Sequence, residues 1–192
     1  DANGCSDTVT ATVGNLNGVL LVSCGITDVT CYGLTNGSVN VCASQGNPGY
    51  TYAWSPNVSV TASETNLAAG TYFITVTDIL GCVATITTTV TQPPQLLITA
   101  TAAPATVCEG TGVQLTGTPA GGAPGYTVTW NPGGLLGNSQ NLIPTATTTY
   151  TVDVVDANGC TADTTVLVTV SAMPVATFSG DSLSGCAPHC VN

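Results

Sequence analysis

Two series of cysteines with a common spacing constrain this chain more than any other feature of its sequence. Within each series the members lie 77 and then 78 residues apart: Cys5, Cys82 and Cys160 form one, and Cys31, Cys108 and Cys186 form the other. Two independent series rarely share one period by chance, and a fixed period is the signature of a tandem array. The sequence therefore predicts repeated domains of about 77 residues each.

Longer motifs recur in the same phase. The motif Asp1-Ala-Asn-Gly-Cys5 returns unchanged at Asp156, and a related motif begins at Asp78. An aromatic motif, Gly49-Tyr-Thr-Tyr-Ala-Trp54, returns as Gly125-Tyr-Thr-Val-Thr-Trp130. Because these motifs are spread over the whole period, each repeat is expected to be a complete domain rather than a single hairpin.

The domains are expected to be out of phase with the ends of the chain. Residues 1–18 are predicted to be the last strand of a preceding repeat, 19–93 a first complete unit, 94–172 a second, and 173–192 the start of a third. Prolines at both junctions between units predict short, stiff links.

Strand patterns dominate the sequence. Tyr72, Ile74 and Val76 alternate with other residues and therefore share one face of a predicted strand. A single Trp on a middle strand, Trp54 in one unit and Trp130 in the next, is the expected core anchor of an immunoglobulin-like domain. Roughly seven short strands per unit then predict an all-β fold of tandem Ig-like Greek-key β-sandwiches.

This layout predicts how the periodic cysteines pair. Within each unit we expect a disulfide from the lead-in of the second strand to the start of the last strand, that is Cys31–Cys82 and Cys108–Cys160. Each bond would close a loop of about fifty residues and contribute roughly 4 kcal/mol in the chain-entropy account. By the same logic, the partner of Cys5 would lie upstream of residue 1.

Four other cysteines leave alternatives open. Cys24 could bridge to Cys42, although a simple hairpin register would not place them opposite each other. Cys186 could pair with a cysteine beyond residue 192 or, within this sequence, with Cys190.

Composition excludes several classes of partner. The chain has no Lys or Arg, ten acidic residues and a formal charge of −10. Binding nucleic acid requires cationic side chains that displace counterions, so nucleic acid is excluded as a partner. No apolar run is long enough to cross a bilayer, which excludes membrane insertion of this stretch. Nine cysteines without paired metal-binding motifs indicate an oxidising, extracellular compartment.

No catalytic constellation is visible, and we expect a protein that is not an enzyme. His189 is the only histidine, which rules out the usual Ser–His–Asp logic and a histidine-rich metal site. Asp78 and Asp156 lie beside hairpin turns, where an Asp side chain caps backbone N–H groups. Calcium is the one cofactor considered, but the aspartates are too scattered to favour it over turn capping: Asp78, Asp153, Asp156 and Asp163. Asn158-Gly159 fits a two-residue primed turn, in which both positions need positive φ.

The first unit resembles the SprB-type repeat of giant gliding-motility adhesins of Bacteroidota. The resemblance rests on motifs spread through the unit: Cys31-Tyr-Gly, Asn36-Gly-Ser38, Gly49-Tyr-Thr-Tyr-Ala-Trp54, Asn66-Leu-Ala-Ala-Gly-Thr-Tyr72, Asp78 with Gly81-Cys82, and Gln92-Pro93. Residues 94–172 are similar to the Ig-like or PKD-like units beside such repeats, and the segment from Ser184 resembles the opening of a PKD domain. The resemblance implies export by the type IX secretion system and display at the cell surface.

The same resemblance implies a modification. Bacteroidota O-glycosylate a short motif of Asp, Ser or Thr, and an apolar residue, which occurs at Asp7-Thr8-Val9 and Asp181-Ser182-Leu183. Thr8 and Ser182 are therefore the expected glycosylation sites. Thr164 matches loosely but alternates onto the inward face, so it is expected to be unmodified.

The expected function is structural. The chain would be a repeat segment of a secreted cell-surface adhesin or filament, serving as its stalk or as the adhesive fibre. Its expected partners are neighbouring repeats of the same or adjacent chains, and surface polysaccharide. Two alternatives are a filament subunit polymerised by strand exchange and an accessory module pair of a secreted polysaccharide-degrading enzyme.

Overall fold

The computed structural model describes residues 18–173, which divide into two compact units. Unit 1 comprises residues 18–29 and 35–91 of this range, and unit 2 comprises residues 30–34 and 92–173. The chain therefore leaves unit 1 for five residues, contributes them to unit 2, and returns. Every helix or strand in the described range is a β-strand.

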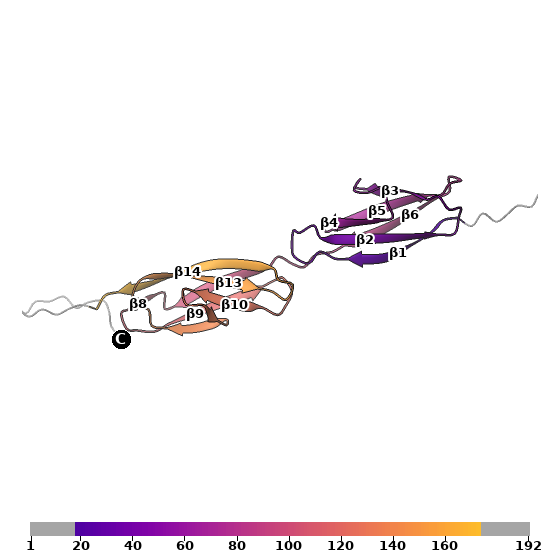
Figure 1. Ribbon diagram of the computed structural model, residues 1–192. Coiled ribbons are helices and arrows are strands. Elements are labelled where there is room, and N and C mark those ends of the chain that lie inside the picture. The colour runs from indigo at the N-terminus through magenta and orange to yellow at the C-terminus, as the bar shows by residue number, and fades with distance from the viewer. Residues whose placement is uncertain (1–17, 174–192) are drawn as a thin grey trace, which may run out of the picture. The chain divides into compact units, whose positions relative to one another are not determined.

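Unit 1 is a sandwich of two antiparallel sheets (Figure 1). One sheet has the order β1 (Leu20–Thr27), β2 (Gly37–Ser44), β4 (Ser63–Leu67). The other has the order β3 (Thr51–Ser55), β5 (Gly70–Thr77), β6 (Val83–Val90). Because alternate residues of a strand face the same side, the inward faces meet in one core: Val39, Val41, Trp54, Leu67, Tyr72, Ile74, Val76 and Val90.

Unit 2 repeats this order and extends it. Its first sheet is β7 (Leu97–Ala103), β9 (Val113–Ala120) and β12 (Ser139–Leu142). Its second sheet contains β10 (Thr127–Asn131), β13 (Thr148–Val155) and β14 (Thr161–Ser171), with β11 (Leu135–Leu136) and β8 (Thr106–Cys108) at its two edges. β8 pairs in parallel with the end of β14, whereas the other pairs are antiparallel.

The exchange of consecutive strands between two sheets is the Greek-key arrangement of an immunoglobulin-like sandwich. The Ig-like all-β fold predicted from the sequence is therefore correct. Each unit also closes its core in the same way. The indole N–H of Trp54 donates to the Thr61 carbonyl at 2.9 Å, and that of Trp130 donates to the Gly137 carbonyl at 3.1 Å. Each acceptor lies seven residues after its Trp, so the two cores share one plan.

A bulge in β1 brings Cys24 to Cys42. Residue pairing shifts between Ser23 and Gly25, so Cys24 is the extra residue of the bulge, while Cys42 lies opposite Val22. A bulge turns a side chain away from its regular position. The two cysteines form a disulfide with their Cα atoms 5.7 Å apart. A regular hairpin register would not place the two cysteines opposite each other, but the register is broken at Cys24 itself.

One buried hydroxyl in unit 1 gives a stability prediction. Thr88 Oγ1 is buried without a hydrogen-bond partner in the described part of the chain. Thr88 lies opposite Tyr72, and the residue opposite Tyr150 in unit 2 is Val166. Thr88→Val should raise the free energy of unfolding of unit 1 by about 1 kcal/mol, because it removes the desolvation cost at nearly constant shape. Urea unfolding followed by Trp54 fluorescence measures this, and a loss of stability would contradict it.

Candidate functional site

The turn between β13 and β14 is organised by one buried carboxylate. Asp156 is only 5% exposed. Its Oδ1 accepts hydrogen bonds from the backbone N–H groups of Asn158 and Cys160, both at 2.9 Å. Its Oδ2 accepts a third from the N–H of Ala123, at 2.8 Å, in the loop before β10. The carboxylate thus fixes Cys160 in place and ties the turn to a neighbouring loop.

Unit 1 contains a second copy of this turn, between β5 and β6. Asp78 is 4% exposed. Its Oδ1 accepts from the N–H groups of Leu80 at 3.0 Å and Cys82 at 2.8 Å. Its Oδ2 accepts from the N–H of Asn47 at 3.0 Å. Each turn also has two backbone hydrogen bonds: the Asp N–H donates to the Cys carbonyl, and the N–H of the Gly before that Cys donates to the Asp carbonyl. All five hydrogen bonds therefore match between the turns, and Cys82 occupies in unit 1 the place of Cys160 in unit 2.

The turns are capped as predicted, but the predicted turn type is wrong. Gly159 has a φ of 82°, whereas Asn158 is not among the residues with positive φ. The Gly159 N–H donates to the Asp156 carbonyl at 3.1 Å, so this is a type I turn followed by a left-handed glycine. The reason is the carboxylate of Asp156, which accepts the Asn158 N–H and thereby holds Asn158 in the ordinary turn conformation.

These carboxylates make stability depend on acid. The hydrogen bond from Asn47 is the largest factor that lowers the pKa of Asp78, and the bond from Ala123 is the largest for Asp156. Because the folded-state pKa lies below the unfolded value of about 3.9, the stabilisation is present above that value. It is lost as the pH falls through the lowered folded-state pKa.

We therefore expect the melting temperature of unit 2 to fall on acidification from pH 6 towards pH 2, and Asp156→Asn to flatten this dependence and lower the melting temperature at pH 6. The amide nitrogen of Asn would face a donor in place of an accepting oxygen. Asp163→Asn, on an exposed strand position, is the matched control and should keep the wild-type stability at pH 6. Calorimetry across this range decides the matter: parallel curves for Asp156→Asn and the wild type would contradict the prediction.

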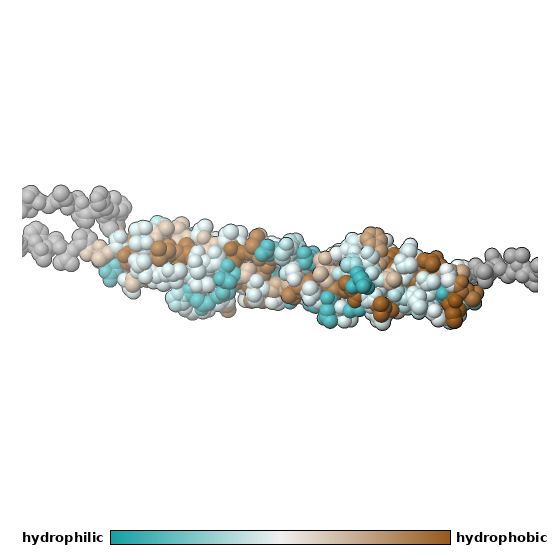
Figure 2. Space-filling view, turned by 90° about the horizontal axis from the view of Figure 1, so that it is seen from above, coloured by the Kyte–Doolittle hydropathy of each residue, from teal (hydrophilic) through white to brown (hydrophobic). Residues whose placement is uncertain are grey.

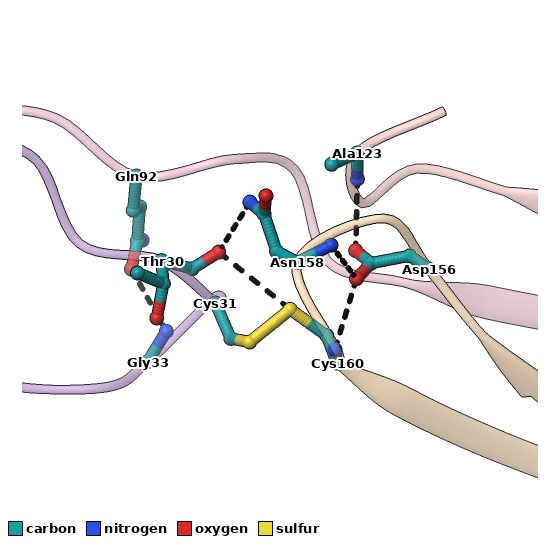
Figure 3. The surroundings of a disulfide bond; sticks show 8 residues. All are labelled: Thr30, Cys31, Gly33, Gln92, Ala123, Asp156, Asn158 and Cys160. Carbon is teal, nitrogen blue, oxygen red and sulfur yellow. Dashed lines mark hydrogen bonds between the residues drawn. A yellow bond between two sulfur atoms is a disulfide. The ribbon is translucent and has the colours of Figure 1, made fainter. Parts of the chain in front are cut away.

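Residues 30–34, from the link between β1 and β2, complete this end of unit 2 (Figure 3). Cys31 is disulfide-bonded to Cys160, with the sulfur atoms 2.04 Å apart. The Thr30 carbonyl accepts a hydrogen bond from Asn158 Nδ2 at 2.9 Å, and its oxygen lies 3.6 Å from Cys160 Sγ. The Gly33 N–H donates to Gln92 Oε1 at 2.8 Å. Unit 2 thus holds this segment by one covalent bond and by polar contacts on both sides of it.

Two predicted disulfides are therefore wrong. The structure pairs Cys31 with Cys160, not with Cys82, and leaves Cys82 unbonded among the cysteines of the described range. Cys108 is disulfide-bonded to a cysteine other than Cys160. The prediction placed Cys31 and Cys108, which precede the second long strand of each repeat, beside the start of its last strand. The structure places these segments beside the end of the last strand, which is β6 in unit 1 and β14 in unit 2.

Strand length explains the correction. The N–H of Val29, two residues before Cys31, donates to the Thr91 carbonyl at 2.9 Å, just beyond the end of β6. Cys82 precedes the start of β6, and the eight residues of that strand span about 26 Å. In unit 2, Cys108 pairs with Ser171 at the end of an 11-residue strand that starts after Cys160. Cys82 and Cys160 thus lie at the start of the last strand of their units, whereas Val29, two residues before Cys31, and Cys108 lie at its end.

The other predicted sites have different outcomes. Thr8, Ser182, Cys186 and Cys190 lie outside the described residues, as do Cys5 and His189. In residues 18–173, no three metal-ligating side chains gather. Asp153 accepts a hydrogen bond from Asn131 Nδ2 at 2.9 Å and lies opposite Asp163 across the strands. Thr164 is half-buried on the inward side of β14.

The surface is weakly polar rather than charged. Figure 2 shows a face dominated by residues of intermediate hydropathy, with scattered apolar residues and few strongly hydrophilic ones. With no Lys or Arg in the chain, the carboxylates cannot pair with these cations, and the buried ones, Asp78 and Asp156, instead accept backbone N–H groups. No helix in residues 18–173 is long and apolar enough to cross a membrane.

The two units thus define a class: Ig-like repeat modules braced by disulfides. Within this class, residues 25–59 match the model of the SprB repeat family. The matched residues run from β1 through β3 and include Cys31. This stretch of the chain is therefore similar to an SprB repeat. No curated protein matches the chain.

Solved structures with similar folds come from several kinds of protein. The ectodomain of mouse nectin-like molecule 4 is 14% identical, with 84% of this chain and 66% of that chain covered and a TM-score of 0.38. The fibronectin(III)-like modules of Clostridium thermocellum CbhA are 10% identical, with 85% and 100% covered and a TM-score of 0.39. A Dscam structure is 17% identical, with a TM-score of 0.33; the match covers 70% of this chain and 41% of the Dscam chain.

Proposed function

We propose that this chain is a load-bearing repeat segment of a secreted adhesin or filament at the cell surface, exported by the type IX route and without enzymatic activity. The SprB repeat at residues 25–59 supports the surface role. The disulfides support an oxidising location outside the cell. Its partners are neighbouring repeats, and surface polysaccharide is the candidate for what the adhesin contacts.

One observation carries the load-bearing role. Unit 2 is bonded through Cys160 to a segment whose flanking residues, Val29 and Thr35, both belong to unit 1. Force that enters through β1 can therefore reach β14 through a covalent bond, without loading the strands between. Such a bypass is of use in a chain that is pulled, because a disulfide does not yield when noncovalent contacts break.

The proposal is tested in cells that make the natural protein. Antibody against residues 18–173 should label intact cells, and deletion of these residues should lower the fraction of cells that stay attached under shear. As a matched control, the segment is replaced by an unrelated Ig-like pair of similar length without a shared disulfide. A stalk role predicts that this replacement restores attachment at low shear but not at high shear. Absence of surface labelling, or unchanged attachment after deletion, would refute the proposal.

A second candidate, a filament subunit joined by strand addition, is favoured by β1. This strand is at the edge of its sheet, and it exposes Leu20, Val22 and Ile26 by 46–48%. An exposed apolar edge is a template for pairing with another strand. Sedimentation of the chain would show concentration-dependent oligomers that Val22→Lys abolishes; a monomer at all concentrations would exclude this candidate.

A further inference from the structure

The duplicated turn is occupied in one unit and open in the other. In unit 2, Cys160 is bonded to Cys31 and only 9% exposed. In unit 1, Cys82 is unbonded and half-buried. The carboxylate bonds that position these two cysteines are the same in type and nearly the same in length. The unit 2 turn therefore shows what the unit 1 turn is shaped to receive.

The occupant in unit 2 has a defined local structure. The Leu34 N–H donates to the Cys31 carbonyl at 3.2 Å, and Gly33 has a φ of 78°. Cys31 is thus the first residue of a turn that requires glycine at its third position. The same turn begins at Cys108, where the Thr111 N–H donates to the Cys108 carbonyl at 3.0 Å and Gly110 has a φ of 83°. A Cys-x-Gly turn is therefore a repeated element of the chain.

In both units, the residue just before the first strand passes the Asp-capped turn in the same way. In unit 1, a Cβ on Gly46 would lie 3.0 Å from Asp78 Oδ2 and 3.1 Å from Val19 Cγ2. In unit 2, a Cβ on Gly122 would lie 2.5 Å from Asp156 Oδ2 and 3.0 Å from Leu96 Cδ1. In both units, therefore, the residue that leads into the first strand lies beside the capped turn. A repeat upstream of unit 1 would reach Cys82 as the segment around Cys31 reaches Cys160.

The rim of the open turn is apolar. Ile79, Leu80 and Val83 are 70%, 63% and 61% exposed around Cys82. The corresponding residues around Cys160 are Ala157, Asn158 and Thr161. The side-chain amide of Asn158 donates a hydrogen bond to the Thr30 carbonyl, whereas the side chain of Leu80 is entirely apolar. Covering these three side chains would remove them from water, so the occupant should present apolar groups next to its cysteine, as Tyr32 and Leu34 do next to Cys31.

We propose that the Cys82 turn is a cross-linking site that receives the Cys-x-Gly turn of another repeat unit through a disulfide. The inference builds on the array role but specifies its chemistry and its partner. Two thiols lose two protons and two electrons to a low-molecular-weight or protein disulfide, which becomes two thiols. In exchange form, the Cys82 thiolate attacks the partner sulfur of a mixed disulfide, and the displaced thiolate takes up the proton that Cys82 lost.

The test offers this site a probe of the proposed kind. The probe is a peptide with the sequence of residues 28–36, Asp-Val-Thr-Cys-Tyr-Gly-Leu-Thr-Asn, supplied as its mixed disulfide with glutathione to the full chain in a glutathione buffer. A peptide of the same composition, with Gly moved away from the second position after Cys, is the control. Mass spectrometry of Cys82 at equilibrium should show about tenfold more adduct with the probe than with the control.

The chain supplies its own reference site. In Cys31→Ser, the turn at Cys160 is vacated and should take the same peptide, since that sequence occupies it in the native chain. Preference at Cys160 without preference at Cys82 would overturn the proposal. If neither turn discriminates, the disulfide map of the natural protein decides. Cys82 bonded to a cysteine with Gly two residues later supports the proposal, and a free thiol or another partner overturns it. None of these readouts depends on adhesion.

Discussion

Replacing Cys31 by serine should lengthen the extension of the chain under force by about 380 Å. In the native chain, a pull between residues 18 and 173 runs along β1 to Cys31, crosses to Cys160 and leaves along β14. The disulfide bypasses a sequence separation of 129 residues. In Cys31→Ser only the Cys24–Cys42 bypass, of 18 residues, is left. The difference of 129 − 18 = 111 residues comes under load, at roughly 3.4 Å each.

Optical tweezers with handles at residues 18 and 173 measure this extension directly. Every chain in the comparison carries Cys108→Ser, so that the disulfide of Cys108 cannot add another bypass. Cys24→Ser is the matched control. With Cys31 intact it should leave the extension unchanged, because the direct route from residue 24 to residue 31 is already the shorter one. Equal extension of the Cys31→Ser and native chains would show that the bond carries no load.

The value of this bond is mechanical more than thermodynamic. Closing a loop of 129 residues would contribute about 5 kcal/mol if the whole loop were unfolded in the reference state. Much of that loop is unit 1, however, and when unit 1 stays folded it already restrains the loop. The gain for unfolding of unit 2 alone is therefore smaller. The mechanical effect, by contrast, does not depend on which unit unfolds first, because the disulfide keeps the residues between Cys31 and Cys160 out of the force path in either case.

The fold was predictable because its signals are local. The alternation of Tyr72, Ile74 and Val76 places all three in the core, and the two Trp residues anchor their units as expected. Alternation depends only on the period of a strand. The capping by Asp78 and Asp156 was equally accessible, since an Asp next to a turn reaches the N–H groups two and four residues on.

The disulfide partners were not predictable from the same signals. A shared period shows which cysteines are equivalent, but not which ends of the strands they occupy. That depends on long-range contacts, among them the hydrogen bonds from Val29 to the Thr91 carbonyl and from the Thr91 N–H to Asp28, which set Cys31 at the far end of β6. The repeated Cys-x-Gly and Asp-x-x-Gly-Cys motifs were visible in the sequence, and they are the two halves of the site. Their joining required the three-dimensional structure.

Replacing Trp130 by alanine should destabilise unit 2 by about 3–5 kcal/mol, the usual cost of truncating a buried aromatic residue. Trp130 is 0% exposed, and its indole N–H donates to the Gly137 carbonyl at 3.1 Å. Its fit is tight, because a Cβ on Gly117 would lie 3.2 Å from Trp130 Cζ2. The truncation therefore leaves a cavity and removes this hydrogen bond. A loss of this size is a large share of the 5–15 kcal/mol that typically stabilises a domain.

Hydrogen exchange in β9 and β13 follows unit 2 without relying on the deleted chromophore, while Trp54 fluorescence reports on unit 1. Protection in β9 and β13 should fall by about two to four orders of magnitude if exchange proceeds through global unfolding. Leu136→Ala, at a side chain that is 70% exposed, removes apolar atoms from the same unit and should cost less than about 0.5 kcal/mol. If the two variants lost protection equally, Trp130 would not be the anchor of this core. A large loss for Trp130→Ala alone, with Trp54 unaffected, would establish that Trp130 anchors unit 2 independently of unit 1.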